Sequence, residues 1–309
     1  MLKIKRSAQA PSSVIMIRPH HFHPNGETAA DNAFQKAPDD NHNEIAEQAR
    51  FEATRAANEL RERGVTVHLF EDEETTTPDS VFPNNWFSTH PGGHVAIYPM
   101  FAESRRSERR QDVIELLKQK YRVQEVIDYS GLEQDHLFLE GTGAMVLDHI
   151  DRVVYAARSN RTDPIALERF CTHFNYEPMV FDASDKSGRA IYHTNVLMCI
   201  ATEFALVGLD LISPENRRDE VRDRLEASGK QVVAISEEQI ADFAGNAIEL
   251  QGNDGRVLAL SKKAEASLEP AQKEVIQQNC ELLPLDVDTI EMAGGSVRCM
   301  IAGIHLASR

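Results

Sequence analysis

Five segments with the same layout recur along the chain at nearly constant spacing. Each begins with a small or polar residue and continues as a short apolar strand, a turn and a second apolar strand, as in GTGAMVLDHIDRVVYAA from Gly141. Spacings of 58, 52, 51 and 50 residues separate the matching positions, which are Asn85, Gly143, Asn195, Asn246 and Ser296. A repeat of about 50 residues is typical of small modules that stack or close into a ring.

We predict that each segment is a hairpin of two strands, because polar turns such as PGGH and GNDG separate the apolar halves. The five hairpins are expected at 84–100, 141–157, 193–209, 245–261 and 294–306. Apolar residues at three- and four-residue spacing predict amphipathic helices within 44–63, 107–121, 163–174, 214–229 and 267–279. An apolar strand follows each helix, at 65–70, 122–127, 177–181, 231–235 and 282–287.

Each module therefore consists of two strands, a helix and a strand, the ββαβ order. A module of this size cannot bury its apolar face alone, so neighbouring modules must pack around a shared centre. Residues at the start of each inner strand are then expected to converge on one cavity. We expect one domain over residues 1–309, because no Pro/Ser/Gly-rich linker interrupts the chain.

Charge and hydropathy exclude several classes of function. The chain has 33 Lys and Arg against 49 Asp and Glu, a net charge of −16. Nucleic acids and anionic membranes both favour clustered basic residues, so neither is expected as a partner. No run approaches the roughly 20 apolar residues of a membrane span, and the start MLKIKRSAQAPSS lacks the apolar core of a secretory signal. We therefore expect a cytoplasmic protein, and a homodimer is left open.

Four cysteines occur, and no two form a C-x-x-C pair that would predict a zinc site. In cytoplasm they are expected to be reduced thiols. Packing in apolar strands or helices is the simplest role for Cys171, Cys199 and Cys280. The cluster His20, His21 and His23 has no second group of ligands to complete a metal site, so we expect an ordinary loop and no metal.

The sequence resembles the guanidine-modifying enzyme superfamily over nearly its whole length. The resemblance is carried by EGTG at Glu140, YHTN around His193 and GGSVRC at Cys299, which stand at the same place in modules two, three and five. Within this superfamily the branch of citrulline-utilisation hydrolases is the nearest match. The resemblance implies an α/β fold, the pentein five-bladed propeller of five ββαβ modules with pseudo-fivefold symmetry.

The chemistry of that superfamily explains the three residue types. The carbon of a guanidino or ureido group is a poor electrophile, and a thiolate from Cys299 is the side chain best suited to attack it near neutral pH. His193 would protonate the leaving amine and then activate water. Glu140 would hold the imidazolium or bind substrate nitrogens. Taken singly, each has a structural alternative: Cys299 in core packing, His193 as a core histidine and Glu140 as a surface carboxylate.

The stretch TPDSVFPNNWF contains the predicted substrate-binding residues Asp79, Asn84 and Asn85. Dimethylarginine hydrolases have an acidic pair where this chain has the two asparagines. Arginine deiminases likewise have an Asp where this chain has Asn195. A guanidinium favours ionised partners, whereas a neutral ureido group is served by amides. This difference favours citrulline, although succinylarginine dihydrolases combine an Asn at the first place with a guanidino substrate.

An amino-acid substrate also has a carboxylate, and the planar fork of arginine matches that group. Arg105 and Arg161 align with carboxylate-binding arginines of the dimethylarginine hydrolases, and Arg18 is a further candidate. For Arg105, an exposed position at the start of a helix is the alternative interpretation.

We therefore predict a cysteine hydrolase that converts citrulline to ornithine, CO2 and ammonia through an S-carbamoyl intermediate. The alternative is an arginine deiminase or a dimethylarginine dimethylaminohydrolase-like enzyme that produces citrulline. An amidinotransferase and a non-enzymatic binding protein of the same fold rank lower. No cofactor is expected, because thiol, imidazole and water suffice for this reaction.

Overall fold

The computed structural model describes residues 7–29, 32, 34–36 and 42–309, and these residues form five small mixed sheets. In every sheet a central strand pairs antiparallel with one neighbour and parallel with the other. A mixed α/β fold of several small sheets agrees with the ββαβ modules expected from the repeat.

In each sheet one strand lies nearest the centre of the molecule, and the other strands follow it outward in the order of their pairing. The first sheet runs outward through β16 (Ala302–Gly303), β1 (Ser13–Pro19) and β2 (Thr66–Asp72). The second is β3 (Phe87–His90), β4 (His94–Ile97) and β5 (Glu125–Asp128). The third is β6 (Val146–Asp148), β7 (Val153–Ala157), β8 (Glu177–Ala183) and β11 (Ile212–Ser213). The fourth is β9 (Met198–Ile200), β10 (Phe204–Val207) and β12 (Gln231–Ala234), and the fifth is β13 (Ile248–Gln251), β14 (Arg256–Ser261) and β15 (Glu281–Leu285).

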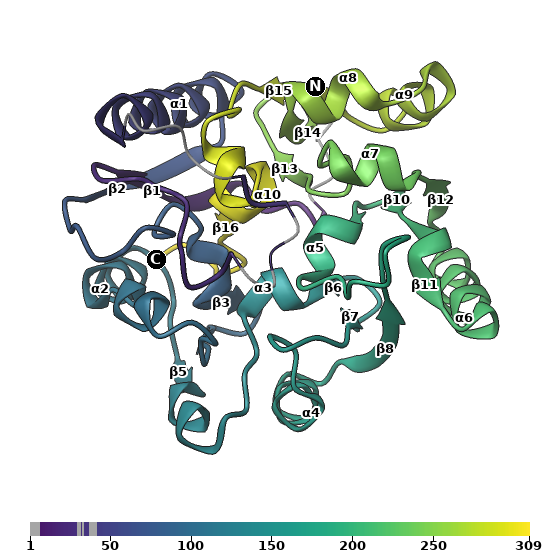
Figure 1. The fold of residues 1–309 in the computed structure, drawn as a ribbon, viewed down its shortest axis with the longest axis horizontal. Helices are drawn as coiled ribbons and strands as arrows, with labels where there is room; N and C mark the ends of the chain where they lie inside the picture. Colours follow the sequence, from purple (N-terminus) through teal and green to yellow (C-terminus); the bar gives the residue numbers. More distant parts are fainter. Residues whose placement is uncertain (1–6, 30–31, 33, 37–41) are drawn as a thin grey trace.

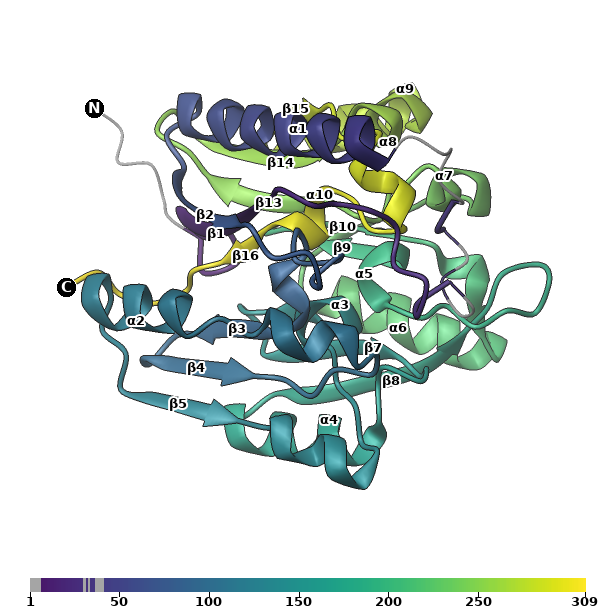
Figure 2. The same cartoon turned by 60° about the vertical axis from the view of Figure 1, so that its left-hand side comes forward.

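The five inner strands surround one centre. Residues of β3, β6, β9, β13 and β16 all line the same pocket, which we call the central pocket. Figure 1 shows short helices near the middle of the molecule and longer helices at its edge. Figure 2, from another side, shows β3, β4 and β5 following one another outward in the order of their pairing. The prediction that the modules share a centre is therefore supported by the arrangement of the sheets.

The longer helices lie where the apolar spacing predicted them. They are α1 (His42–Glu62), α2 (Gln111–Lys120), α4 (Pro164–Phe174), α6 (Glu215–Ala227) and α9 (Pro270–Gln277), with the shorter α7 (Glu237–Ala241) and α8 (Lys262–Ser267). Local capping explains the start of α4, because the Asp163 side chain accepts hydrogen bonds from the backbone N–H groups of Ile165 and Ala166 and Pro164 follows at the first position. Of the helices that the structure describes, none combines the length and the apolar character needed to cross a membrane.

The first four predicted hairpins are present, and the fifth prediction is wrong. After the short helix α10 (Val297–Met300), β16 does not pair with a following strand but lies antiparallel to β1, with Val14 opposite Gly303. The last module is therefore completed by β1, α1 and β2 from the beginning of the chain. The reason is geometric, because a ring of modules closes only when its first and last segments share a sheet.

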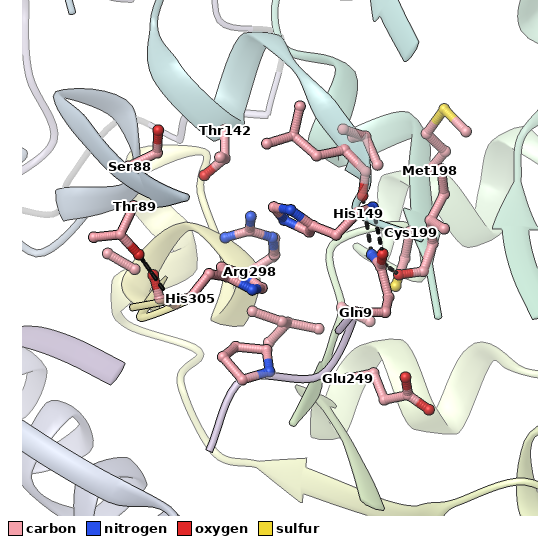
Figure 3. Close-up of a pocket in the computed structure, with 18 of the residues that line it drawn as sticks. Gln9, Ser88, Thr89, Thr142, His149, Met198, Cys199, Glu249, Arg298 and His305 are labelled. Carbon is pink, nitrogen blue, oxygen red and sulfur yellow. Dashed lines mark hydrogen bonds between the residues drawn. The ribbon is translucent and has the colours of Figure 1, made fainter. Parts of the chain in front are cut away.

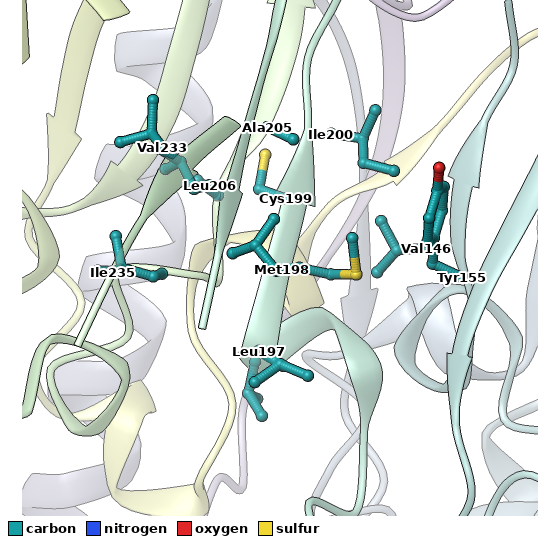
Figure 4. Close-up of a cluster of buried hydrophobic side chains, with 14 of the residues drawn as sticks. Val146, Tyr155, Leu197, Met198, Cys199, Ile200, Ala205, Leu206, Val233 and Ile235 are labelled. Atoms are coloured by element: carbon teal, nitrogen blue, oxygen red, sulfur yellow. The ribbon is translucent and has the colours of Figure 1, made fainter. Parts of the chain in front are cut away.

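Between the sheets and the helices lie continuous apolar layers. Figure 4 shows one of them, in which Cys199 and Met198 of β9 pack among Leu206, Val233 and Val146 from neighbouring strands. A second layer joins the first and second sheets through Ile15, Ile17 and the fully buried Trp86. Burial of each such side chain contributes about 1.5–3 kcal/mol relative to exposure, so these layers hold the inner strands and the turns that precede them in fixed positions.

Candidate active site

A short helical turn precedes four of the five inner strands, namely β3, β6, β9 and β16. These turns are η1 (Pro83–Asn85), α3 (Gly141–Ala144), α5 (Thr194–Leu197) and α10. Glu140 is the residue directly before α3, His193 is the residue directly before α5, and Cys299 lies inside α10. Because the turns occupy equivalent places in successive modules, their side chains point toward a common region.

Hydrogen bonds link each turn to the next. The Thr142 hydroxyl donates to the backbone oxygen of Asn84 at 3.2 Å, and the Thr194 hydroxyl donates to the backbone oxygen of Ala144 at 2.6 Å. The Asn246 side-chain amide continues the series. It donates to the backbone oxygen of Asn195 at 3.0 Å and accepts from the backbone N–H of Arg298 at 3.0 Å. This series fixes the relative positions of the turns that hold the predicted catalytic residues.

A pocket opens beside these turns, and we call it the Cys299 pocket. Its lining contains predicted site residues together with others, namely Thr28, Asn32, Asp79, Phe82, Asn85, Arg105, Arg161, Tyr192, His193, Ala293, Gly295 and Cys299. Cys299 and His193 are almost completely buried, so the pocket exposes little of either to bulk water.

Glu140 and His193 form a buried pair. His193 Nε2 lies 2.7 Å from Glu140 Oε2, and the Glu140 side chain is fully buried. Burial raises the pKa of Glu140, but the charge of Arg161 and the hydrogen bond with His193 outweigh it and hold this pKa well below its usual range. Burial lowers the pKa of His193, against the opposing effect of Glu140. At neutral pH the pair is therefore a carboxylate and a neutral imidazole, which is able to accept a proton.

Cys299 differs from the other three cysteines in its surroundings. Its Sγ accepts hydrogen bonds from the side-chain amides of Asn195 at 3.2 Å and Asn246 at 3.3 Å. Burial raises the pKa of each of the other three thiols to about 12, in Cys171, Cys199 and Cys280. Two amide donors directed at one sulfur stabilise negative charge on it.

Arg105 lies at the wall of the pocket within a buried group of carboxylates. It contacts Glu108 through Nε and Nη2 at 2.9–3.1 Å and donates from Nη1 to Asn85 Oδ1 at 2.9 Å. Asp79 lies 3.7 Å from Arg105 Nε and accepts a hydrogen bond from Asn25 Nδ2 at 2.9 Å. Burial disfavours the charge of Arg105, but Glu108, Asp79 and Glu140 together raise its pKa above the ordinary value. The guanidinium is therefore permanently charged.

Arg161 is the second cation of the pocket. Its Nη1 lies 3.4 Å from Glu140 Oε2, and its guanidinium carbon lies 5.1 Å from the ring centre of Tyr192. The Tyr192 hydroxyl donates to the backbone oxygen of Gly294 at 2.6 Å, which ties this wall to the segment that leads into α10. Arg105 and Arg161 thus line the same pocket.

The three predicted asparagines have different surroundings. Asn85 lines the pocket, and its Nδ2 has no hydrogen-bond partner among the described residues. Asn195 is buried beside Cys299, with its Oδ1 likewise unpartnered in the described structure. Asn84 is fully buried and does not line the pocket. Gly143 accommodates this arrangement, because a Cβ there would lie 2.2 Å from Asn85 Nδ2 and 3.0 Å from His193 Nδ1.

Arg18 does not join the site. It lies on β1, where its guanidinium pairs with Glu71 and donates to the Thr54 hydroxyl at 3.2 Å. Its placement therefore does not support a role in substrate binding. Nearby His20 also contacts Glu71, at 2.7 Å. Within the described ranges, no three side chains of His, Cys, Asp or Glu gather closely enough to hold a metal ion.

Sequence reasoning missed three residues that the structure places at the site. Asn246 donates to the sulfur, Glu108 holds Arg105, and Tyr192 lies over Arg161. For two of these residues the sequence contains a pattern that indicates their place at the site. Asn246 occupies a matching position of the repeat, and Glu108 follows Arg105 at helical spacing. Tyr192 had none beyond its place next to His193.

Comparison with known proteins identifies relatives of this arrangement. A family model described as N,N dimethylarginine dimethylhydrolase, eukaryotic, matches residues 18–306. A search of curated proteins gave no match. Among solved structures, the N-terminal domain of ArgZ, covalently bound to a reaction intermediate, superposes with a TM-score of 0.74 at 18% identity, covering 94% of this chain and 97% of that domain. ArgZ is described as an arginine dihydrolase from the ornithine-ammonia cycle in cyanobacteria.

Two further structures show the same fold. AgrE in complex with ornithine and NAD+ has a TM-score of 0.75 at 17% identity, covering 96% of this chain and 40% of that one. A dimethylarginine dimethylaminohydrolase bound to 4-chloro-2-hydroxymethylpyridine has a TM-score of 0.64 at 14% identity, covering 95% and 99%. This chain also covers 40% of the longer ArgZ chain. At these identities the structural matches establish the fold alone.

Proposed function

The chain belongs to the N,N-dimethylarginine dimethylhydrolase family, whose members are hydrolases of guanidino C–N bonds, and from this membership we propose that Cys299 is the nucleophile of such a hydrolysis. The proposed substrate is arginine or an Nω-substituted arginine, and the proposed product is citrulline with ammonia or an alkylamine. His193 and Glu140 act with Cys299, and Asp79, Asn85, Arg105 and Arg161 bind the substrate.

One observation carries this proposal. Three residues from three modules, far apart in the sequence, meet beside one buried pocket: a thiol with two amide donors, an imidazole and a carboxylate 2.7 Å from that imidazole. A nucleophile beside a base that is itself oriented by a third group is the arrangement required for covalent catalysis. Structural cysteines, such as Cys199, lack these neighbours.

The first chemical step forms a bond between Cys299 Sγ and the guanidino carbon. Neutral His193 takes the thiol proton, and the sulfur then attacks to give a tetrahedral adduct. The C–N bond to the terminal nitrogen breaks, and His193 returns the proton to the departing amine. An S-amidino intermediate remains on the enzyme. Glu140 stabilises the imidazolium while His193 holds the proton, because its carboxylate is ionised throughout.

The second step restores the enzyme with one water molecule. His193, neutral again, takes a proton from the water, whose oxygen attacks the same carbon. The C–S bond breaks, citrulline leaves, and the proton held by His193 returns to the sulfur. Per turnover one water is consumed and one amine is released.

The charges around the pocket support a cationic substrate. The Asp79 carboxylate lines the pocket, and Glu140 lies directly behind His193. Two guanidinium groups, on Arg105 and Arg161, serve the opposite end of an amino acid, where the α-carboxylate lies. The prediction of citrulline as the main substrate rested on neutral asparagines. The family description and the relatives that act on arginine or methylarginine favour the guanidino alternative instead.

Citrulline remains a second candidate because of one feature. Asn85 Nδ2 is an amide donor without a partner among the described residues, and a ureido oxygen is the acceptor that it lacks. The same thiol would then form an S-carbamoyl intermediate and release ammonia. Water would release ornithine and CO2 from the adduct. Both candidates use Cys299, His193 and Glu140 in the same roles.

Product identification separates the two candidates. Purified protein is incubated with arginine, with Nω-methylated arginines and with citrulline, and the products are identified by chromatography and mass spectrometry. We expect citrulline from arginine or a methylated arginine, and no turnover by a Cys299→Ala variant. Ornithine from citrulline, with all guanidino substrates untouched, would establish the second candidate. Turnover of none of the substrates would refute both.

We also propose that residues 1–309 form one catalytic domain, a propeller of five blades related by approximate fivefold symmetry. In its support, five mixed sheets contribute one inner strand each to the central pocket. The matching positions of the repeat also agree with this arrangement. Asn85, Gly143 and Asn195 lie in the turns before their inner strands, and Asn246 and Ser296 lie in the segments that lead to β13 and α10.

A further inference from the structure

Arg298 precedes the proposed nucleophile directly but contributes to a different pocket. It lines the central pocket, which lies between the inner strands. Figure 3 shows its guanidinium group in the middle of that pocket, next to the imidazole of His149. Cys299, one residue later, lines the Cys299 pocket instead.

The guanidinium of Arg298 is poorly satisfied by the protein. Its Nη1 donates to the backbone oxygen of Ile301 at 2.9 Å, and this is its one hydrogen bond to the residues that the structure describes. A guanidinium has five N–H donors, so four remain for other acceptors. Among the described residues Arg298 also has no ion pair, whereas Arg105, Arg161 and Arg256 each contact a carboxylate.

The groups around Arg298 do not supply the missing negative charge. Burial, and then neighbouring positive groups that include Arg298, hold the pKa of His149 well below its ordinary value and lower that of His305 to about 4. Both imidazoles are therefore neutral. Glu249 also lines the pocket, but its carboxylate already contacts Arg256 at 3.0 Å and the Thr202 backbone N–H at 2.9 Å. In Figure 3 this carboxylate points away from the Arg298 guanidinium.

We propose that the central pocket is a binding site for a small oxyanion, held by the guanidinium group of Arg298. An oxyanion supplies the negative charge that Arg298 lacks, and two of its oxygens can accept parallel hydrogen bonds from the guanidinium fork. Hydroxyl groups of Ser88, Thr89 and Thr142 border the same space. The chemistry is common to phosphate and carboxylate groups.

The site would lie directly behind the nucleophile. The Asn246 amide bridges the two pockets, since it donates to Cys299 Sγ and accepts from the backbone N–H of Arg298. An anion in the central pocket therefore has a short structural connection to the sulfur. The proposal concerns binding alone and does not depend on which substrate the enzyme uses.

Calorimetric titration of the full chain with inorganic phosphate tests the proposal, with ionic strength held constant by chloride. Acetate, titrated in a second series, distinguishes a phosphate site from a carboxylate site. We expect one saturable site in the native protein. Arg298→Met should weaken binding about tenfold or more, because a charge-assisted contact is lost. Arg298→Lys, which keeps a charge, should retain part of it, and Arg222→Met on the exposed face of α6 should bind like the native protein.

The Cys299 pocket contains two arginines of its own, so the location of the bound ion must be checked. Prior alkylation of Cys299 with 2-chloroacetamidine fills that pocket and should leave the phosphate site intact. Three outcomes would overturn the proposal: no saturable binding by the native protein, equal binding by the folded Arg298→Met variant, or loss of binding on alkylation. The first and third need no variant, so the test stands even where Arg298→Met fails to fold.

Discussion

The Cys299 pocket and the central pocket lie on either side of one helical turn, α10. They differ in whether their arginines are paired with carboxylates. In the Cys299 pocket, Arg105 and Arg161 both face carboxylates, and Glu140 is shared between a cation and His193. In the central pocket the single cation Arg298 has no carboxylate partner among the described residues. The cations of the Cys299 pocket are therefore paired with carboxylates, whereas, in the part of the chain that the structure describes, the cation of the central pocket is not.

The same contrast separates two thiols. Cys299 lies on a turn with two amide donors on its sulfur, while Cys199 lies on β9 and lines the central pocket among apolar side chains. Burial raises the pKa of Cys199 to about 12, so it is a neutral thiol at any physiological pH. Position within a module, more than burial, therefore distinguishes the proposed nucleophile from a core cysteine in this fold.

The largest expected difference is between these two cysteines. Cys299→Ala should lower kcat/KM about 10³-fold or more, because no other group can form the covalent intermediate. Cys199→Ala should leave kcat/KM within about twofold and lower the free energy of unfolding by about 1 kcal/mol, the usual cost of a point substitution. Steady-state kinetics and chemical denaturation of both variants test the comparison. A comparable loss of activity in both would mean that position within the module does not distinguish the two thiols.

The next effect concerns two buried glutamates, Glu140 behind His193 and Glu249 in the central pocket. Glu140→Gln should lower kcat about 10²-fold, since the imidazolium loses its stabilising charge. His193 must be neutral to accept the thiol proton, so activity falls as the pH drops through its pKa. That pKa already lies below its ordinary 6.5 because of burial, and Glu140 opposes the shift. The acid limb should therefore move to still lower pH in Glu140→Gln.

Glu249→Gln, in the central pocket, provides the matched control. It removes a carboxylate that contacts Arg256 and Thr202, so it should cost stability but leave the acid limb of the pH–rate profile unchanged. Rate profiles from about pH 4 to 8 span the ordinary range of both carboxyl and imidazole groups. A limb that stays in place in Glu140→Gln would argue that His193 is not the group that titrates.

A smaller effect is expected at Gly143. An added Cβ would lie 2.2 Å from Asn85 Nδ2 and 3.0 Å from His193 Nδ1, so Gly143→Ala must displace one of these side chains. We expect the free energy of unfolding to fall by about 1–3 kcal/mol, as at other overpacked sites. We also expect kcat/KM to fall about tenfold, which corresponds to an activation free energy higher by about 1.4 kcal/mol. At Gly131 nothing lies within 4 Å of the corresponding Cβ, so Gly131→Ala should behave like the native protein.

The smallest effect should come from Asn246, which forms a hydrogen bond with one lining residue of each pocket. Asn246→Ala removes one of two donors to Cys299 Sγ and the acceptor for Arg298 N–H, while Asn195 keeps its own bond to the sulfur. A neutral hydrogen bond contributes about 1 kcal/mol, which corresponds to roughly a fivefold loss of kcat/KM. Asn279→Ala, whose side chain bonds to Val275 near the end of α9, serves as the control. Equal kinetics in the two variants would contradict a role for Asn246 at the sulfur.

The repeat in the sequence predicted those features that depend on where a residue lies within its module. Glu140, His193 and Cys299 all lie in or directly before the short turns at the start of their modules' inner strands, and so any closed arrangement of those modules brings them close together. Helices α1, α2, α4, α6 and α9 also lie within or next to the predicted ranges, because each has a clear apolar face. These features follow from local sequence patterns repeated in order.

Features that depend on closure were not predictable in this way. The expected hairpin at 294–306 is replaced by pairing of β16 with β1, a contact between distant ends of the chain. Only its residue type makes Arg18 a candidate, and on β1 its side chain pairs with Glu71 instead of reaching the site. Asn84 and Asn85 are adjacent in sequence, but only Asn85 lines the Cys299 pocket, a difference that depends on the geometry of η1.

The pairing of β1 with β16 also affects how the molecule loses its structure. A linear array of repeats frays from its terminal units, because each of these has a neighbour on one side only. In this protein Val14 and Ile15 join Gly303 and Ala302, so the unit that would be terminal is shared by the beginning and the end of the described chain. No unit is left to peel away first, and melting should proceed as a single all-or-none event in which both pockets disappear together.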